Sequence, residues 1–286
     1  MAGLLHWVTE VPTLRHPLLL VALEGFVDAG GVGSSAATFL RHRWQSEVVA
    51  TFDRDALIDF RARRPTAVID AGKLRRVDWP AIELLVAHVS GPQDVLLLIG
   101  PEPDMAWSAF CEAVVDTCRS LEVEAVFHLG AYPATRPHTR PVRIVKATSG
   151  PGDHLVPQVG GATGYTGPVG VATVLQAVLG DHGIPAVGLW AEVPHYIAGS
   201  PNPSGALEMA RLVGRLVGTA LDTTELEAAA KLHVEQVDGA VAEHPEARQM
   251  VAALERHVDA GGMEQELPSG EDIAAEIERF LRSQSD

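Results

Sequence analysis

Short apolar runs alternate with amphipathic segments along the first 220 residues, and this pattern predicts strands that alternate with helices. The runs at residues 17–23 and 94–99 have the length and composition of buried strands. Further strands are predicted at residues 47–52, 66–69, 123–129 and 184–190, and helices at residues 32–40, 105–120, 168–181 and 204–221. The alternation predicts the α/β fold class, with a mostly parallel sheet covered on both faces in a three-layer α/β/α sandwich.

Two stretches fit this alternation less simply. Residues 82–89 could form one arm of a hairpin, because Gly91 and Pro92 link them closely to the next strand, or they could form a short helix. Residues 150–170 carry seven glycines, which is typical either of a mobile lid or of a loop that a partner orders.

The pattern changes after residue 221 and predicts a helical extension. Thr224 and Glu227 have the spacing of a capping box that opens a first helix. Pro245 fits the first turn of a second helix, residues 261–270 read as a linker, and Ser269 with Asp272 predicts a third helix. We therefore predict a core domain of residues 1–221 and an acidic helical extension of residues 222–286.

Most of the negative charge lies in that extension. The chain has a net charge of −15, and residues 221–286 hold 16 acidic side chains against 5 basic ones. Such a field repels nucleic acid and anionic lipid, so we expect neither as a partner. It would suit a basic protein surface, although a solvated helical face is the more common explanation. No apolar run approaches the length of a membrane span and no signal peptide is evident, so we expect a cytoplasmic protein.

The two cysteines predict neither a disulfide nor a metal site. Cys111 and Cys118 lie on one predicted helix, where two turns separate their Cα atoms by about 10 Å, too far for a disulfide. We expect both to be buried core thiols. The histidines show no ligand spacing, and no cofactor or metal is predicted.

Polar residues follow the predicted strands, where ligands gather in open α/β sheets. This set comprises Glu24, Asp28, Glu102, Arg136, His138, Arg140, Glu192 and His195. Glu24, Glu192 and His195 are the candidates for catalysis, and Glu24 with Glu192 could act as an acid/base pair if their loops converge. No G-x-S-x-G nucleophile elbow, HExxH motif or P-loop occurs in the sequence.

The glycine-rich turn at residues 25–37 resembles a dinucleotide fingerprint only in part. Gly31, Gly33 and Ala36 fit G-x-G-x-x-A, and Asp53 follows near the end of the next strand. About seven residues separate the first glycine from its strand, and the carboxylates of Glu24 and Asp28 would repel a pyrophosphate. We therefore expect a tight turn in which glycine permits positive φ.

Two segments remain candidates for binding a small anion. In the turn, the helix N-terminus beside Ser34 could hold one, with Asp28, Gly30 and Gly31 as its neighbours. Arg136, His138 and Arg140 form a basic loop between prolines, which could grip a phosphate or carboxylate. The alternative for this loop is an ordinary surface segment with salt bridges.

Several blocks of the sequence resemble the proteasome assembly chaperone family, which is named after its second eukaryotic member. They are PLLLVALEGFVDAGGVGSSAATFL, RPTAVIDAG, LLLIGPEPDMAWSAF, GAYPATRPHTRPV, AEVPHYIAGSPNPSGALEMARLV and LPSGEDIAAEIERFLR, which together span nearly the whole chain. The chain looks most like the bacterial branch. The resemblance implies a phosphorylase/hydrolase-like α/β/α fold, self-association as a trimer or larger ring, and binding to proteasome α subunits.

One feature of that family is missing. Some members end in a hydrophobic residue, a tyrosine and any residue, which dock between α subunits, whereas this chain ends Arg282-Ser-Gln-Ser-Asp286. We favour a non-catalytic, protein-binding homo-oligomer. The alternative is an enzyme or small-anion-binding protein with a site at the loops that follow the strands, and a third possibility is a stable oligomer whose partner is not the proteasome.

Overall fold

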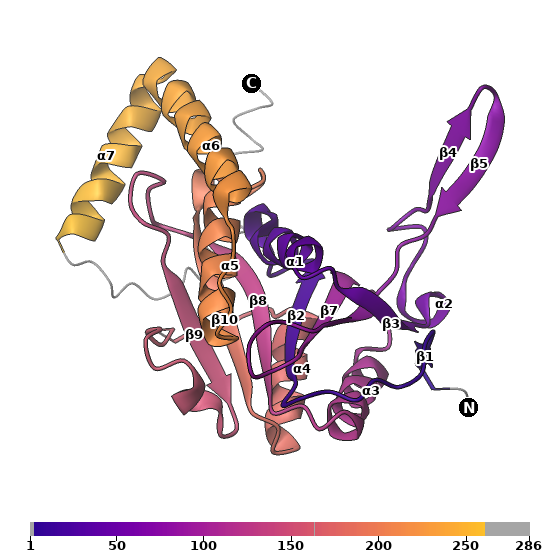
Figure 1. Cartoon of the computed structure of the whole chain (residues 1–286). Coiled ribbons are helices and arrows are strands. Elements are labelled where there is room, and N and C mark those ends of the chain that lie inside the picture. The colour runs from indigo at the N-terminus through magenta and orange to yellow at the C-terminus, as the bar shows by residue number, and fades with distance from the viewer. Residues whose placement is uncertain (1–2, 163, 261–286) are drawn as a thin grey trace.

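A mixed eight-stranded sheet forms the centre of the computed structural model, which describes residues 3–162 and 164–260 (Figure 1). The strand order is β1-β3-β6-β7-β2-β8-β10-β9. Four adjacent strands run parallel: β7 (Val95–Pro101), β2 (Leu18–Glu24), β8 (Ala125–Ala134) and β10 (Ala186–Pro194). The remaining four pair antiparallel with their neighbours: β1 (Leu5–Trp7), β3 (Glu47–Phe52), β6 (Glu83–Ala87) and β9 (Ile144–Ser149).

The prediction of a mostly parallel sheet is therefore wrong for the outer strands. The stretch at residues 82–89 contains β6, which pairs with β7 as an antiparallel hairpin, and the short-helix alternative is wrong. The link between them is too short for the crossover that a parallel pair needs. Strands β1 and β9 were not predicted, since β1 has three residues and β9 mixes polar and apolar positions without alternation.

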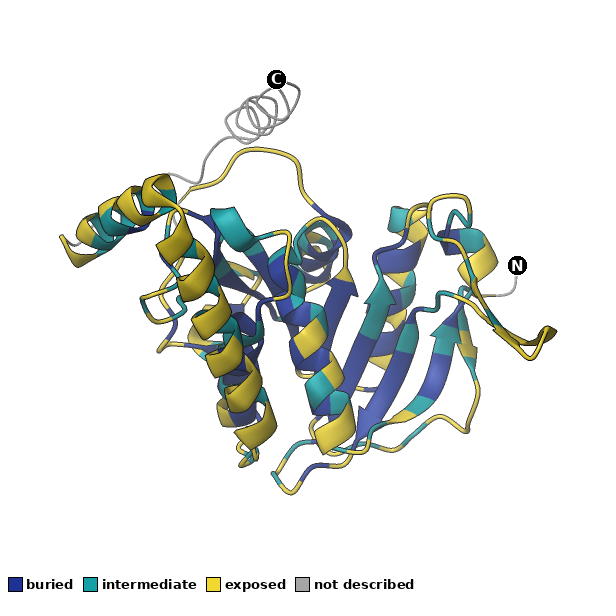
Figure 2. Ribbon diagram, turned by 90° about the horizontal axis from the view of Figure 1, so that it is seen from above, coloured by how far each residue is buried: buried dark blue, intermediate teal, exposed yellow. Residues whose placement is uncertain are grey.

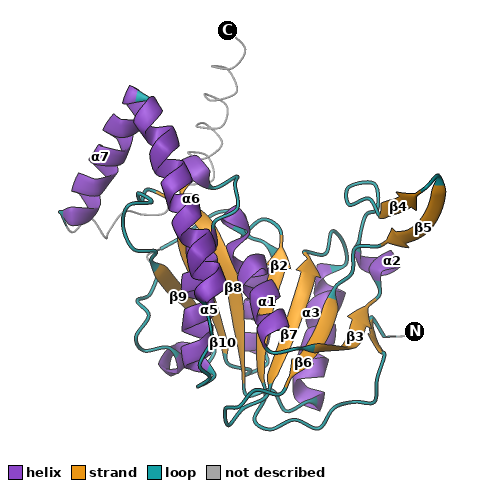
Figure 3. Ribbon diagram, turned by 45° about the horizontal axis from the view of Figure 1, so that its top comes forward, coloured by secondary structure: helices purple, strands orange, loops and turns teal. Residues whose placement is uncertain are grey.

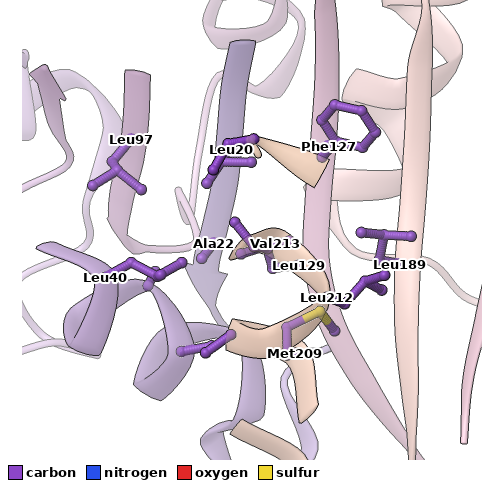
Figure 4. Packing of buried hydrophobic residues seen from close by; sticks show 14 of the residues in the cluster. Leu20, Ala22, Leu40, Leu97, Phe127, Leu129, Leu189, Met209, Leu212 and Val213 are labelled. Atoms are coloured by element: carbon purple, nitrogen blue, oxygen red, sulfur yellow. The ribbon is translucent and has the colours of Figure 1, made fainter. Parts of the chain in front are cut away.

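Helices cover both faces of the sheet (Figure 3). One face packs against α1 (Val32–Arg43) and α5 (Pro203–Leu216), and the other against α3 (Trp107–Ser120) and α4 (Val171–Asp181). Successive residues of β2 serve the two faces in turn, because side chains alternate along a strand: Leu20 lies in the first core with Leu129 and Met209 (Figure 4), and Leu19 lies in the second. The α/β prediction with helix layers on both faces is confirmed.

The buried thiols of Cys111 and Cys118 belong to the second core, as predicted. Burial raises the pKa of Cys111 to about 11 and that of Cys118 to about 12, so both thiols stay protonated at neutral pH.

A separate two-stranded arm projects from the sheet between α2 (Arg54–Leu57) and β6 (Figure 1). It consists of β4 (Thr66–Asp70) and β5 (Lys73–Asp78), which pair only with each other. The strand predicted at residues 66–69 exists, but it lies outside the main sheet and β5 was not predicted. Nearly all arm residues are exposed, in contrast to the mostly buried central strands (Figure 2).

The extension begins with two helices, α6 (Thr224–Glu243) and α7 (Pro245–Asp259). Helix α6 packs along α5, and α7 starts at Pro245 as predicted. The predicted capping box is wrong by one residue, because Thr223 is the N-cap residue: its hydroxyl donates to Glu227, and the carboxylate of Asp222 accepts from the backbone N–H of Thr224. The predicted linker and third helix lie outside the described residues, and the division at residue 221 stays a prediction.

No helix among the described residues is both long and apolar enough to cross a lipid bilayer.

Candidate functional site

The parallel strands β7, β2, β8 and β10 end at one edge of the sheet, and the turn after β2 is closed there by a carboxylate. Asp28 Oδ1 accepts the backbone N–H groups of Gly33 at 2.7 Å and Ser34 at 3.4 Å, at the first turn of α1. Burial raises the pKa of Asp28, and the hydrogen bonds from Ser34 and Gly33 oppose that rise. The N–H groups at the N-terminus of α1 are thus already engaged by the side chain of Asp28.

The glycines of this turn have structural roles. Gly30 and Gly31 have φ of 62° and 59°, the left-handed conformation expected for them. A Cβ on Gly33 would lie 2.2 Å from the carbonyl oxygen of Leu129, so glycine lets α1 approach β8. Asp53 caps the short helix α2 instead of facing this turn, and two strands separate β3 from β2. The spacing G-x-G-x-x-A therefore reflects a turn and close packing.

Glu102, which follows β7, joins two backbone segments. Its carboxylate accepts the N–H of Phe26 at 3.0 Å and the N–H of Val171, the first residue of α4, at 2.5 Å. The side chain is almost fully buried. It fixes the turn after β2 against the start of α4, which is a structural role.

The two proposed catalytic carboxylates are not brought together. Glu24 is exposed at the end of β2 and is in register with Pro101 of β7. Glu192 lies on β10 in register with Tyr132 of β8, and β8 separates the two strands. An acid/base pair of Glu24 and Glu192 has no support in this arrangement.

Glu192 is instead the centre of a polar cluster. Its Oε1 accepts from Tyr132 Oη at 3.2 Å and from Arg143 Nη1 at 3.1 Å, and Arg136 Nη1 lies 3.9 Å from Oε2. Burial raises the pKa of Tyr132, and the adjacent Glu192 raises it further. Burial lowers the pKa of Arg136, against the attraction of Glu192. Sequence reasoning missed Tyr132 and Arg143, because only the pairing of β9 and β8 with β10 brings them to Glu192.

The basic loop after β8 contacts the extension. His138 Nε2 lies 3.0 Å from Asp238 of α6, while its Nδ1 lies 2.6 Å from Tyr196 Oη. Arg140 donates through Nε and Nη2 to the two carboxylate oxygens of Asp259, at 2.9 and 2.6 Å, and through Nη1 to Glu255 at 3.1 Å. His138 and Arg140 thus bind carboxylates of α6 and α7, whereas Arg136 of the same loop lies beside Glu192 of β10.

His195 has a structural environment as well. Its Nδ1 lies 3.3 Å from the carbonyl oxygen of Ala134, and its ring meets Tyr196 edge to face. Ser34, another candidate, donates its hydroxyl to the carbonyl of Gly31. Ser34 adjoins the carboxylate of Asp28, but that carboxylate accepts the backbone N–H groups of Gly33 and Ser34 and so caps α1.

A small cavity lies between the basic loop and α6. Its volume is about 20 Å³, and Arg136, His138, Glu192 and His233 are among the residues that line it. A space of this size holds about one water molecule. A larger depression of about 380 Å³ lies at the opposite edge of the sheet, beside Arg43. Within residues 3–162 and 164–260, no three His, Cys, Asp or Glu side chains cluster as metal ligands would.

Comparison with known proteins agrees with this architecture. The model of the PAC2 family matches residues 22–241. A Corynebacterium glutamicum protein of unknown function superposes with a TM-score of 0.83 at 30% identity, covering 90% of this chain and 98% of its own. A Mycobacterium tuberculosis proteasome-assembly chaperone homologue has a TM-score of 0.74 at 33% identity, covering 82% and 99%.

A more distant structure shares the fold alone. PbaB of Pyrococcus furiosus, an archaeal proteasome activator, has a TM-score of 0.66 at 16% identity, covering 82% of this chain and 97% of its own. No curated protein matches the sequence significantly. The family match spans most of the chain, and two bacterial relatives share about a third of its residues over four fifths of its length or more. The chain therefore belongs to the PAC2 family.

Proposed function

We propose that this chain is a non-catalytic, protein-binding member of the PAC2 family that acts in the cytoplasm as a homo-oligomer. We propose a trimer as its assembly and proteasome α subunits as its partner. Support comes from the bacterial relative described as a proteasome-assembly chaperone homologue, and from the fold shared with an archaeal proteasome activator. Family membership alone does not fix a function, so the residues of the site have to carry the proposal.

The proposal rests on one observation: the candidate side chains bind other groups of the same chain. Asp28 binds the N-terminus of α1, while His138 and Arg140 bind carboxylates of the extension. Each side chain is engaged by the chain itself, and the adjoining cavity has room for about one water. This favours a surface that recognises proteins over a pocket that converts a small molecule.

The test is an affinity purification of the tagged full-length protein from its own cells at low salt, followed by mass spectrometry. We expect proteasome α subunits to be enriched over their recovery with a tagged acidic protein of equal net charge. Purified α subunits should then bind directly. Failure to recover α subunits from extracts that contain them would remove the proteasome from the proposal.

A second candidate function rests on the cluster around Glu192. The finer fold that we infer, phosphorylase/hydrolase-like, is shared by enzymes that bind anions at the ends of their strands. The side chains of Arg136 and Arg143 both lie beside the carboxylate of Glu192, so this cluster carries one positive charge in excess. If the site binds a small anion, phosphate should raise the thermal midpoint of the wild-type protein and should not raise that of Arg143→Gln. Equal midpoints with and without phosphate would dismiss this alternative.

A further inference from the structure

Helix α7 buries little apolar surface of its own. Val251 is its one fully buried residue, and it belongs to none of the apolar core clusters among the described residues. Figure 1 shows α7 at the outer edge of the molecule, joined to α6 and apart from the helices that cover the sheet. Because little apolar area leaves water, the hydrophobic effect contributes little to holding this helix. Its position therefore depends largely on its contacts with α6 and with the loop after β8.

The loop after β8 binds two carboxylates of α7 in a defined geometry. Arg140 donates to both carboxylate oxygens of Asp259 and to Oε1 of Glu255. The hydroxyl of Thr139 donates to the same Oε1 at 2.6 Å. Glu255 and Asp259 are four positions apart, so they lie one turn apart on one face of the helix. Thr139 and Arg140, called the carboxylate site below, thus fit a helix that presents two carboxylates at this spacing.

The loop that carries the carboxylate site is fixed by contacts that do not involve α7. The hydroxyl oxygen of Tyr196 accepts the backbone N–H of His138 at 2.8 Å and lies 2.6 Å from its Nδ1. The side chain of His138 is only 4% exposed. Arg136 Nε donates to the carbonyl oxygen of Pro141 at 3.0 Å, which closes the loop on itself. A site fixed before binding loses little conformational entropy when a ligand arrives.

Without α7, the surroundings of the carboxylate site carry an excess of positive charge. The loop holds three arginines, and ion pairs bring two carboxylates to it from β10 and α6: Arg136, Arg140 and Arg143 against Glu192 and Asp238. Three positive charges against two negative ones leave one positive charge in excess. The two carboxylates of α7 turn this into an excess of one negative charge. An open carboxylate site therefore attracts acidic ligands and repels basic ones.

The contacts that hold α7 at the carboxylate site are exchangeable. The side chains of Asp259 and Glu255 are 56% and 30% exposed. Water solvates exposed ions well when such an ion pair opens, so the pair adds little net stability. A ligand with the same two carboxylates replaces each hydrogen bond that α7 gives up by an equivalent one.

We propose that α7 is a displaceable occupant of the carboxylate site, and that an acidic helix of a partner protein, with two carboxylates one turn apart, binds Thr139 and Arg140 in its place. While α7 is bound, the apparent affinity for the partner helix is reduced by the fraction of molecules in which the site is open. Helix α7 is thus an intramolecular competitor, and a partner gains access when its helix binds the site better than α7 does. This role needs neither the homo-oligomer nor the proteasome partner proposed above.

The experiment uses the full-length chain and a labelled, alanine-based helical peptide with glutamates at positions i and i+4. Binding is measured by fluorescence anisotropy at about 0.1 M salt, where surface charges still act. A matched peptide has its glutamates at i and i+2, which do not share a helix face. The release variant is Glu255→Gln with Asp259→Asn. Glu243→Gln with Glu246→Gln removes the same charge from exposed positions and is the control. Circular dichroism establishes that each variant is folded.

We expect the release variant to bind the i, i+4 peptide with a dissociation constant about 10-fold lower than those of the wild type and the control. Adding Arg140→Gln to the release variant should abolish this gain. Saturating peptide should also accelerate amide exchange in residues 245–259 of the wild type, because it displaces α7. Equal dissociation constants for the wild type and the release variant, or equal binding of the two peptides, would overturn the proposal. Loss of peptide binding in an equal concentration of inorganic phosphate would assign the site to a small anion and would overturn it as well.

Discussion

Arg140 and Asp259 form a two-point ion pair, with Nε–Oδ1 at 2.9 Å and Nη2–Oδ2 at 2.6 Å, that joins the loop after β8 to the last turn of α7. The hydrogen bonds from Arg140 lower the pKa of Asp259, and those from Asp259 raise the pKa of Arg140. Glu255 of the same helix also binds Arg140. Apart from its packing on α6, helix α7 is connected to the core mainly by these contacts.

We therefore predict that Arg140→Gln releases α7 without unfolding the core. Amide hydrogen exchange in residues 245–259 should accelerate, while the strands of the sheet keep their protection. Arg75→Gln, which removes an ion pair within the arm, is the matched control and should leave α7 unchanged. Unaltered exchange in α7 would show that its packing on α6 is sufficient to hold it.

The same pair predicts a pH dependence. Because the folded-state pKa of Asp259 is lowered, its contribution is present above its unfolded value of about 4 and is lost as the pH falls through the lower folded value. The release of α7 should therefore appear below about pH 4 in the wild type. Asp259→Asn removes the carboxylate at every pH. In this variant the amides of α7 should therefore already lose protection from exchange at pH 7, unlike those of the wild type.

The sequence pattern predicts the central strands of the sheet, but it does not predict the outer strands or the separate arm, and the reason is physical. Residues 95–99 and 184–190 carry no charged or hydrogen-bonding side chain apart from the indole of Trp190, which is typical of a strand buried on both faces. The strand at residues 66–69 has a similar composition but joins the arm, because a local pattern shows which residues avoid water and not what they pack against.

The candidate site illustrates the same limit. The basic loop and the acidic extension were both visible as charge, yet the pairing of His138 with Asp238 spans 100 positions and follows from the way α6 packs on α5. Arg143 carried no local signal, because it reaches Glu192 only through the antiparallel pairing of β9 with β10.

Asp94 should be a major contributor to stability. It is 1% exposed, and burial alone would raise its pKa, but hydrogen bonds from the side chain and backbone of Arg15, with His88 nearby, lower the pKa to about 2. A shift of this size corresponds to about 2 kcal/mol of folding free energy, present above pH 4 and lost as the pH falls through 2.

Asp94→Asn should therefore lower the free energy of unfolding by about 2 kcal/mol at pH 7, measured by urea denaturation. The difference from wild type should shrink as the pH is lowered toward 2, where the wild-type carboxylate also becomes protonated. Asp70→Asn removes an exposed pair in the arm and should have a much smaller effect. A deficit that stays constant with pH would assign the effect to packing instead of charge.

His128 lies at the centre of the sheet without a hydrogen-bond partner among the described residues for either ring nitrogen. Burial lowers its pKa to about 3. Between pH 6.5 and 3 the unfolded chain binds a proton that the folded protein does not, so stability falls by up to about 1.4 kcal/mol per pH unit. His128→Leu removes this loss, and the acid-unfolding midpoint should move to lower pH. His244→Gln, at an exposed position, should leave the midpoint unchanged.

Glu102 provides a graded test of the junction between the turn after β2 and α4. Glu102→Ala leaves the N–H groups of Phe26 and Val171 without their acceptors and should cost about 2 kcal/mol of unfolding free energy. Glu102→Gln keeps one carbonyl oxygen and should lose roughly half as much. Equal losses in both variants would mean that charge, not the number of acceptors, holds the junction.

The boundary at residue 221 can be tested with two truncations. The core should remain folded after removal of residues 222–286, because both core clusters are built mainly from earlier residues. That truncation does remove Leu226, which packs against the first core, and the pair between Glu227 and Arg211. It should therefore melt several degrees lower but still cooperatively, whereas truncation after His244 keeps α6 and should melt close to the full-length chain. Loss of cooperative unfolding in the shorter protein would mean that α6 is part of the core, and the family match through residue 241 would then mark the true domain.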